Sequence, residues 1–278
     1  MIPIHENLAN KVAVITGGSG VLCSAMAKEL ARQKVKVAIL GLTPDRVYKV
    51  TDEINASGGT AIPVVANVLD KESLIKAKKQ ILAEFGQIDF LINGAGGNHP
   101  DGITDKEYFN SNMEGTSFFD LQEEGFSNVF DLNFIGTFLP CKVFGEALLQ
   151  SDMPSIINIS SMSAFTPLTK VAAYSAAKAS INNFTSWLAV HFAQTGLRVN
   201  AIAPGFFITQ QNKDLLVDTN GQYTARSKKI IEATPMKKFG EPEQLLGALL
   251  FLLDPSYSSF VTGTTIPVDG GFNAYSGV

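Results

Sequence analysis

Cysteine is nearly absent from this sequence, since the 278 residues contain only Cys23 and Cys141. The two lie far apart, and neither belongs to a CxxC pair or to a Cys/His cluster. The pattern therefore suggests neither a disulfide framework nor a zinc site. We expect no metal site, and a reducing, cytoplasmic location.

Charged residues and long hydrophobic runs are also scarce. Charged residues make up 17% of the chain, against roughly 25% in an ordinary globular domain. The net charge of −4 argues against nucleic-acid binding, which needs clustered cations. The longest apolar run, Leu245–Leu253, has nine residues, whereas a membrane-spanning helix needs about 20. The N-terminus also lacks the cationic start and apolar core of a signal peptide. We expect neither nucleic acid nor membrane as a partner.

Short, continuously apolar runs alternate with longer helical patterns along the chain. Such runs are typical of strands that are covered on both faces. No linker or repeat divides the sequence, so we expect one domain over residues 1–278. The predicted strands are Val12–Ile15, Val35–Leu40, Ala61–Val65, Ile88–Ile92, Ser155–Ile159, Arg198–Ile202 and Thr264–Pro267.

Helical patterns fill the spaces between these runs. Strand–helix alternation over this length predicts an α/β fold, a doubly wound Rossmann-type parallel sheet of about seven strands with helices on both faces. Ligands of such folds bind outside the carboxyl ends of the strands. The predicted helices are Ala25–Arg32, Pro44–Ala56, Lys71–Phe85, Phe126–Leu149, Ala173–Gln194 and Glu243–Leu253.

The first strand runs into a glycine turn, KVAVITGGSG. Gly17 and Gly18 permit a tight turn, and the helix that follows offers free N–H groups to a pyrophosphate. A dinucleotide loop usually has further glycines where this chain has Val21 and Cys23. We interpret Cys23 as a small apolar residue packed against the sheet.

A second group of polar residues follows the fifth strand. Ser160 and Ser161 stand at its carboxyl end, and Tyr174 and Lys178 lie four apart on one face of a predicted helix. A lysine beside a tyrosine favours the phenolate and lowers the tyrosine pKa. Such a tyrosine can exchange a proton with a carbonyl or carbinol oxygen.

With these residues the chain resembles the short-chain dehydrogenase/reductase family over about residues 9–272. Tyr174 and Lys178 form the family's YxxxK pair, and Ser161 lies thirteen residues before the tyrosine. Four further motifs occur in order, each after a predicted strand or in a predicted helix. They are TGGSG (16–20), NGAG (93–96), LNFIG (132–136) and PGFFIT (204–209).

The resemblance implies an NAD(P)-dependent oxidoreductase acting on CH–OH and assigns a role to each matching residue. Tyr174 is the expected general acid/base, and Ser161 orients the substrate oxygen. Lys178 lowers the tyrosine pKa and binds the nicotinamide ribose, and Asn133 holds a water on the proton path. The expected cofactor contacts are Gly17, Gly18, Ser19, Val21, Leu22, Asn67, Val68, Asn93, Ala95, Gly96, Tyr174, Lys178, Pro204, Gly205, Phe207 and Thr209.

The choice between NAD and NADP stays open. NAD-preferring enzymes usually have a carboxylate at the end of the second strand, where this chain has Gly41. The next position, often arginine in NADP enzymes, is Leu42. Arg46, on the first turn of the next helix, is either a phosphate contact or a solvated residue. Asn67 stands where many relatives have aspartate against the adenine.

The substrate is expected beneath two variable segments. A polar loop at about 97–125 is longer than in most relatives, and loops of this length are often functional. The segment at about 206–235 is rich in amides and is the expected substrate lid. Both favour a polar, hydroxylated substrate, and an acid would also need a cation, for which Lys170 and Lys213 are candidates. The expected substrate contacts are Asn98, His99, Ser161, Ser163 and Gln210.

Within the family, the loop sequences resemble a sugar-acid subgroup, the D-mannonate oxidoreductases (fructuronate reductases) and gluconate 5-dehydrogenase-like enzymes. We expect D-fructuronate/D-mannonate or 5-ketogluconate/gluconate as the substrate pair. A 3-ketoacyl carrier protein reductase is the enzymatic alternative, in which Lys228, Lys229, Lys237 and Lys238 would face an acidic carrier. A cofactor-binding regulator without turnover is the non-enzymatic one. Relatives commonly form tetramers, so a homo-oligomer is expected.

Overall fold

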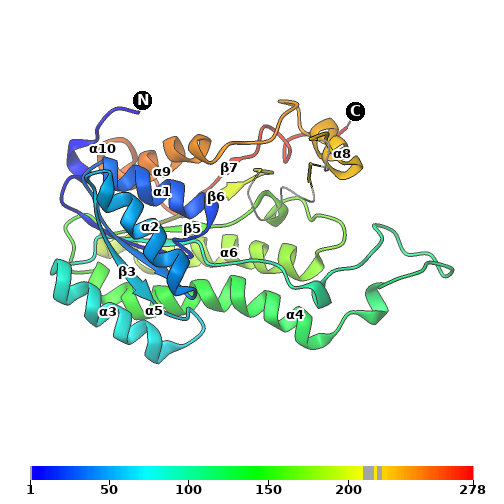
Figure 1. The fold of residues 1–278 in the computed structure, drawn as a ribbon. Helices are drawn as coiled ribbons and strands as arrows, with labels where there is room; N and C mark the ends of the chain where they lie inside the picture. The colour runs from blue at the N-terminus through cyan, green and yellow to red at the C-terminus, as the bar shows by residue number, and fades with distance from the viewer. Residues whose placement is uncertain (1, 209–215, 218–220, 278) are drawn as a thin grey trace.

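The chain folds around one parallel sheet of seven strands, in the order β3-β2-β1-β4-β5-β6-β7 (Figure 1). The computed structural model describes residues 2–208, 216, 217 and 221–277. All seven predicted strands are confirmed, with ends that shift by at most two residues. They are β1 (Val12–Thr16), β2 (Lys36–Gly41), β3 (Thr60–Val65), β4 (Phe90–Asn93), β5 (Ser155–Ile159), β6 (Arg198–Pro204) and β7 (Thr265–Val268).

Helices cover both faces of the sheet, as the continuous apolar strands predicted. α1, α2 and α9 lie on one face, and α3, α5 and α6 lie on the other (Figure 1). Across the described residues, no helix is long and apolar enough to span a membrane. The helices are α1 (Val21–Arg32), α2 (Pro44–Ala56), α3 (Lys71–Phe85), α4 (Glu123–Phe130), α5 (Gly136–Leu148), α6 (Ala172–His191), α8 (Ala225–Ala233), α9 (Leu246–Leu253) and α10 (Pro255–Ser258).

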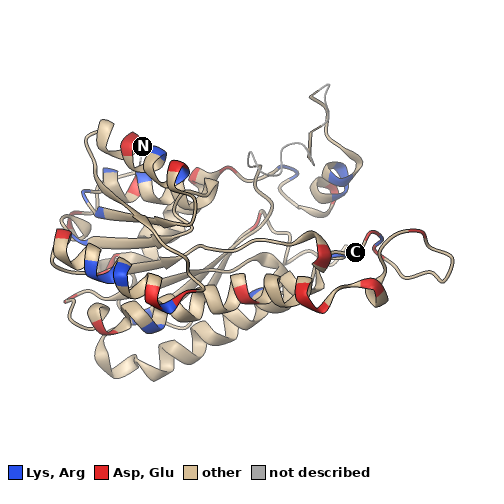
Figure 2. Ribbon diagram, turned by 60° about the horizontal axis from the view of Figure 1, so that its bottom comes forward, with Lys and Arg blue, Asp and Glu red and all other residues tan. Residues whose placement is uncertain are grey.

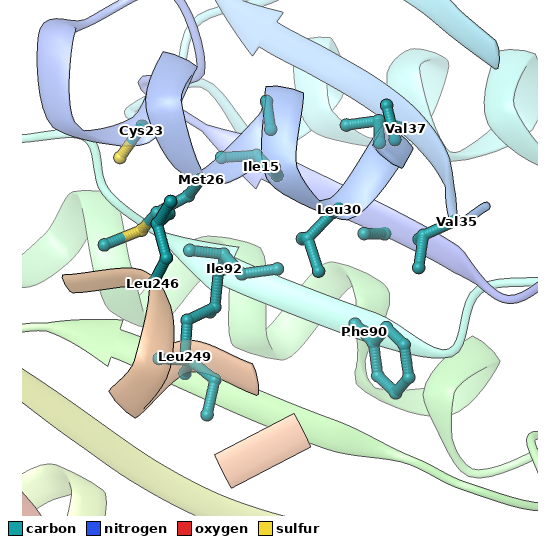
Figure 3. Close-up of a cluster of buried hydrophobic side chains, with 14 of the residues drawn as sticks. Ile15, Cys23, Met26, Leu30, Val35, Val37, Phe90, Ile92, Leu246 and Leu249 are labelled. Atoms are coloured by element: carbon teal, nitrogen blue, oxygen red, sulfur yellow. The ribbon is translucent and has the colours of Figure 1, made fainter. Parts of the chain in front are cut away.

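Alternate residues of each central strand supply the two cores, because side chains along a strand point to opposite faces. Figure 3 shows the first core, where Met26 and Leu30 of α1 and Leu249 of α9 pack toward Ile15 and Ile92. All of these side chains are buried. This packing holds α1, and with it the glycine turn that precedes the helix, against the carboxyl ends of β1 and β4.

The predicted helix Phe126–Leu149 is interrupted in the structure. α4 and α5 are joined through a π-helical turn, Asp131–Ile135, which contains Asn133. π-turns of this kind are frequent at functional sites. The helical pattern in the sequence identified the helix but gave no sign of this turn, because one wider turn leaves the apolar spacing on either side almost unchanged.

The 97–125 segment leaves the carboxyl end of β4 and extends away from the sheet before it returns into α4 (Figure 1). Its two arms are joined by the Asp105 N–H, which donates to the Thr116 carbonyl oxygen over 2.8 Å, and by the Thr116 N–H, which donates to the Asp105 carboxylate over 2.6 Å. Near its tip, Tyr108, Phe109 and Phe119 are exposed. The segment is therefore an ordered hairpin-like arm beside the expected site.

Candidate active site

A cavity of about 820 Å³ opens along the carboxyl ends of the strands. This is where the fold is expected to bind a ligand. Its wall combines the glycine turn after β1, the end of β2, the loops after β4 and β6, and the start of α6. The sequence-predicted residues that line it are Gly17, Ser19, Val21, Leu22, Asn67, Val68, Ala95, Gly96, Asn98, Ser161, Tyr174, Lys178, Pro204, Gly205 and Phe207.

The glycine turn has the shape that a pyrophosphate needs. Gly17 has φ +62°, a left-handed conformation, and a Cβ there would lie 2.8 Å from the backbone of Gly94 and Ala95. A Cβ on Gly18 would lie 2.8 Å from the carbonyl oxygen of Ile15. α1 begins directly after this turn without a side-chain cap, so its first N–H groups remain available to an anion. The residues present therefore fit a dinucleotide.

Cys23 lies on the first turn of α1, in the wall of the cavity. Its side chain is buried against Gly94, and burial raises the pKa of the thiol to about 12. The thiolate is the reactive form of cysteine. Cys23 is consequently a packing residue at neutral pH, which agrees with the interpretation from the sequence.

The side chains of Ser161 and Tyr174 both line this cavity, and the Ser161 hydroxyl lowers the pKa of the Tyr174 phenol against the effect of burial. Ser161 follows β5, and Ser163 donates to its oxygen over 3.0 Å. Lys178 lies one turn beyond Tyr174 on α6, with its Nζ 5.6 Å from the centre of the tyrosine ring. The Lys178 Nζ donates to the carbonyl oxygen of Ile159, at the end of β5, over 2.8 Å. Two elements distant in sequence thus bring three candidate residues together.

The pKa of Tyr174 differs from the expectation. Burial raises it, and the Ser161 hydroxyl opposes that effect only in part. The Lys178 ammonium group donates to the Ile159 carbonyl oxygen and lies over the tyrosine ring, so burial sets the direction of the shift in the protein without a ligand. Burial also lowers the pKa of Lys178 to about 8, against a smaller opposing effect of Cys23.

Asn133 lies behind the cavity wall and is fully buried. Its Nδ2 donates to the carbonyl oxygens of Gly97 and Val129, each over 2.7 Å. A Cβ on Gly96 would lie 2.6 Å from the Asn133 Oδ1 and 3.3 Å from the Lys178 Nζ. The π-turn therefore sets Asn133 against the loop after β4 and close to Lys178.

The end of the cavity beside β2 has no carboxylate. A Cβ on Gly41 would lie 2.8 Å from Val47 Cγ2 and 3.2 Å from the Ser19 hydroxyl. These two side chains therefore occupy the space that a larger residue at position 41 would need. Arg46 and Thr43, at the start of α2, line this end. Arg46 thus faces the ligand cavity from its place on the first turn of α2.

Four of the predicted residues lie outside the cavity lining or in other surroundings. Asn93 is buried in the sheet, where its Nδ2 donates to Asn158 Oδ1 over 2.9 Å and to Cys141 Sγ over 3.2 Å. Gly18 supports the turn from beneath, and Ser163 lies behind Ser161. His99 caps a short 3-10 helix, its Nδ1 accepting from the Asp101 N–H over 3.3 Å.

Two further predicted residues, Thr209 and Gln210, and the candidate cation Lys213 lie outside the described residues. Sequence reasoning also missed Leu132 and Phe206, which line the cavity. Their adjacency to the motif residues Asn133 and Phe207 was the available signal.

A family model described as short chain dehydrogenase matches residues 11–220. The uncharacterised oxidoreductase UxuB of Bacillus subtilis strain 168 is 66% identical over 278 residues, which is 100% of each chain. A Synechocystis 3-oxoacyl-[acyl-carrier-protein] reductase is 33% identical over 265 residues, 95% of this chain and 97% of the relative.

Among solved structures, the chain is similar to a Haemophilus influenzae protein proposed to be a D-mannonate oxidoreductase, crystallised with bound NAD. The TM-score is 0.94 at 53% sequence identity, and the match covers 98% of each chain. Family model, relatives and fold agree, and members of this family use NAD(P) to act on CH–OH groups. The chain therefore belongs to the short-chain dehydrogenase family of oxidoreductases.

Proposed function

We propose that this oxidoreductase interconverts a ketone and a secondary alcohol on a sugar acid, either D-fructuronate/D-mannonate or 5-ketogluconate/gluconate. The observation that carries the proposal is that Ser161 and Tyr174 both line the 820 Å³ cavity whose wall also includes the glycine turn. A carbonyl oxygen that reaches both hydroxyls meets a proton donor and an orienting hydrogen bond together.

Tyr174 is the general acid/base of the proposed reaction. Its raised pKa keeps the phenol protonated at neutral pH, so in the reductive direction it can donate to the oxygen that becomes the alcohol. Ser161 holds the same oxygen, and Ser163 fixes the Ser161 hydroxyl from behind. The chemistry that a bound nicotinamide supplies is hydride transfer.

Lys178 and Asn133 support the tyrosine. Since its pKa of about 8 lies above neutrality, Lys178 is mostly protonated at pH 7 and can bind ribose hydroxyls from the cavity floor. Asn133, tied to Gly97 and Val129, is the proposed position for a water on the proton path between Lys178 and solvent. Buried hydrogen bonds hold both side chains in place, Lys178 to the Ile159 carbonyl oxygen and Asn133 to those of Gly97 and Val129.

The cofactor contacts proposed from the family motifs are the residues of the cavity wall, with Thr209 added from sequence alone. The bound NAD of the Haemophilus protein supports a nicotinamide dinucleotide here. Asn93 is proposed to contact the cofactor through its backbone at the end of β4, because its side chain is hydrogen-bonded to Asn158.

The sugar-acid substrate is supported by the proposed activity of the Haemophilus protein and by the polar sequence of the 97–125 segment. Asn98 lines the cavity at the start of the 97–125 segment. Ser161 lines the cavity, with Ser163 behind it, and Ser163, His99 and Gln210 remain substrate candidates from the sequence. We propose that the 97–125 segment and the lid segment at 206–235 enclose the substrate between them.

A homo-oligomer, a tetramer by family expectation, is also part of the proposal. Trp187 on α6 and Phe260 before β7 are exposed by 58% and 102%, and such an assembly could bury both side chains. Cys23 and Cys141 are free thiols, which supports a reducing, cytoplasmic location.

The decisive experiment follows oxidation of NADH and of NADPH in parallel on D-fructuronate, 5-keto-D-gluconate and an acetoacetyl thioester. Turnover of a keto-acid sugar is the expected result and also identifies the cofactor. Turnover of the thioester alone would replace the proposal by the carrier-protein alternative, which the 33% identical Synechocystis reductase favours. Against that alternative, Lys229 is already paired with Glu107, and the Lys237 Nζ donates to the Glu232 carbonyl oxygen over 2.7 Å.

A further inference from the structure

One face of α6 carries a row of polar side chains. Tyr174, Lys178, Asn182 and Thr185 are four, four and three residues apart, so they lie along the same side of the helix. The proposed mechanism uses the first two at the cavity and gives no role to the others. Thr185 is fully buried and Asn182 is half-buried. Because a buried polar group costs free energy unless it is hydrogen-bonded, the partners of these two side chains indicate what the row does.

Lys178 is a buried cation that is held by a neutral acceptor. Figure 2 shows most Lys, Arg, Asp and Glu positions on the helices and loops around the sheet, and Lys178 is the one such residue in α6. The ion pairs in the part of the chain that the structure describes do not include it. Its Nζ donates instead to the Ile159 carbonyl oxygen over 2.8 Å. Since the ammonium group ends a flexible four-carbon stem, the position of the helix turn that carries Lys178 decides which acceptors it reaches.

Ser160 attaches this turn of α6 to the end of β5. Its hydroxyl donates to the Asn182 Oδ1 over 2.6 Å, and its oxygen lies 3.4 Å from the carbonyl oxygen of Lys178. Ser160 is buried in the cavity wall, directly before Ser161. Its own backbone is fixed, because its N–H donates to the Ile202 carbonyl oxygen of β6 over 2.8 Å. The turn from Lys178 to Asn182 is therefore tied to a fixed point beside the reacting groups.

Two hydrogen bonds thus join one turn of α6 to two successive residues at the end of β5. The Lys178 Nζ donates from the helix to Ile159, and the Ser160 hydroxyl donates from the strand end to the helix. The second bond does not involve the ammonium group. It can therefore hold the turn while Lys178, which has three N–H donors, bonds to Ile159 and to a ligand at once.

A third bond holds α6 on the sheet independently of Asn182. The Asn158 Nδ2 in β5 donates to the Thr185 Oγ1 over 2.9 Å, and both side chains are fully buried. Ile181, next to Asn182, is fully buried as well. Loss of the Asn182 bond should therefore leave the helix packed and should loosen chiefly the turn that carries Lys178.

We propose that Ser160 and Asn182 are positioning residues, whose hydrogen bond sets α6 against β5 so that Lys178 reaches the ligand in the cavity. The inference rests on the proposed function, in which Lys178 binds the nicotinamide ribose and supports Tyr174. It adds the two residues that fix where the ammonium group lies. Neither of them needs to touch the substrate.

The first test measures NADH binding and turnover in Asn182→Ala. The Kd for NADH, from fluorescence titration, should rise about threefold to tenfold, the usual effect of losing one well-placed hydrogen bond. The kcat on D-fructuronate should fall about tenfold, since a small misplacement of a positioned group is costly, while the KM for D-fructuronate should not change. Asn182→Asp keeps an acceptor oxygen for Ser160 and should recover most of both losses. Asn183→Ala, at the exposed neighbouring position, is the matched control and should change none of these values.

Ser160→Ala removes the other partner of the bond. It should give the same losses as Asn182→Ala, and the double variant should lose no more than either single variant, because the two residues act as a pair. Additive losses would overturn the inference. So would a wild-type Kd for NADH in both single variants together with a lower melting temperature, which would make the bond purely structural. If the wild type binds NADH but does not reduce D-fructuronate, the proposed substrate is wrong, and the Kd values for NADH still decide the inference.

Discussion

The sulfur of Cys23 occupies the space that a side chain at Gly94 would need. A Cβ built on Gly94 would collide with the Cys23 Sγ and would lie 3.0 Å from the carbonyl oxygen of Thr16. Gly94 does not have a positive φ, so the glycine is required here for space and not for conformation. The departure from the glycine pattern on α1 is therefore matched by a glycine after β4, and the two positions form one packing unit.

Gly94→Ala should lower the free energy of unfolding by about 1–3 kcal/mol, the usual effect of overpacking a buried site. The added methyl group must displace Cys23 from the first turn of α1, so cofactor affinity should fall as well. The double variant Cys23→Ala/Gly94→Ala should recover part of both losses, because the Cys23 Cβ lies 3.6 Å from the new methyl group, an ordinary contact. Urea denaturation and cofactor titration measure the two effects.

Gly247→Ala is the control for this pair. It adds the same methyl group on α9, where no heavy atom lies within 4 Å of the new Cβ, and alanine favours a helix over glycine by about 1 kcal/mol. Its stability should stay equal or rise. A double variant no more stable than Gly94→Ala would show that the two positions are not coupled.

Tyr174→Phe should reduce turnover by about 10²- to 10⁴-fold, the range expected for loss of a positioned proton donor. The change removes the hydroxyl and keeps the ring, so the folded structure and cofactor affinity should be nearly unchanged. Turnover by stopped-flow and cofactor binding by fluorescence test the two halves separately. Substantial remaining activity would contradict the acid/base role of Tyr174.

The sheet was predictable because its physics is local. The run Val12–Ile15 is continuously apolar, as is typical of a strand covered on both faces, and every residue of β1 is buried. The handedness of the crossovers was predictable as well, whereas the strand order comes from the structure. Helix α8 was missed, because its sequence ARSKKIIEA is short and has only two large apolar side chains.

The positions of the site residues were predictable where motif residues stand at strand ends. They were not predictable where a side chain can form hydrogen bonds with several neighbours. The sequence placed Tyr174 and Ser161 in one cavity, as the structure has them. It had no means of foreseeing that Asn93 would hydrogen-bond to Asn158 within the sheet or that His99 would cap a 3-10 turn. These contacts depend on residues 2 to 65 positions away, whose placement only the folded chain fixes.

Lys178 should give stability a measurable dependence on pH. Its pKa is about 8 in the folded protein and about 10.4 in an unfolded chain. Between these values the unfolded chain binds more protons, so the contribution of Lys178 to the free energy of unfolding rises with pH, by up to about 1.4 kcal/mol per unit. Below pH 8 both states are protonated and the contribution is constant.

Urea denaturation of the wild type and of Lys178→Met, at half-unit steps from pH 7 to pH 9.5, isolates this contribution. The difference in stability should be flat up to about pH 8 and should then shift in favour of the wild type. If the stabilities of the two proteins changed in parallel over the whole pH range, Lys178 would have an ordinary pKa. Its ammonium group would then be better solvated than its burial implies.

Arg46 should decide how well the enzyme accepts NADPH. It lines the adenosine end of the cavity, where Gly41 leaves no carboxylate to repel a 2′-phosphate. Arg46→Ala should raise the KM for NADPH about tenfold and leave the KM for NADH nearly unchanged, because only the phosphate can form a charged hydrogen bond with the guanidinium. Lys49→Ala, one turn further along α2, removes a cation of the same helix and should alter neither value. Equal effects of the two variants on NADPH would mean that α2 acts through its general charge, and no effect of either would leave Arg46 a solvated residue at the edge of the site.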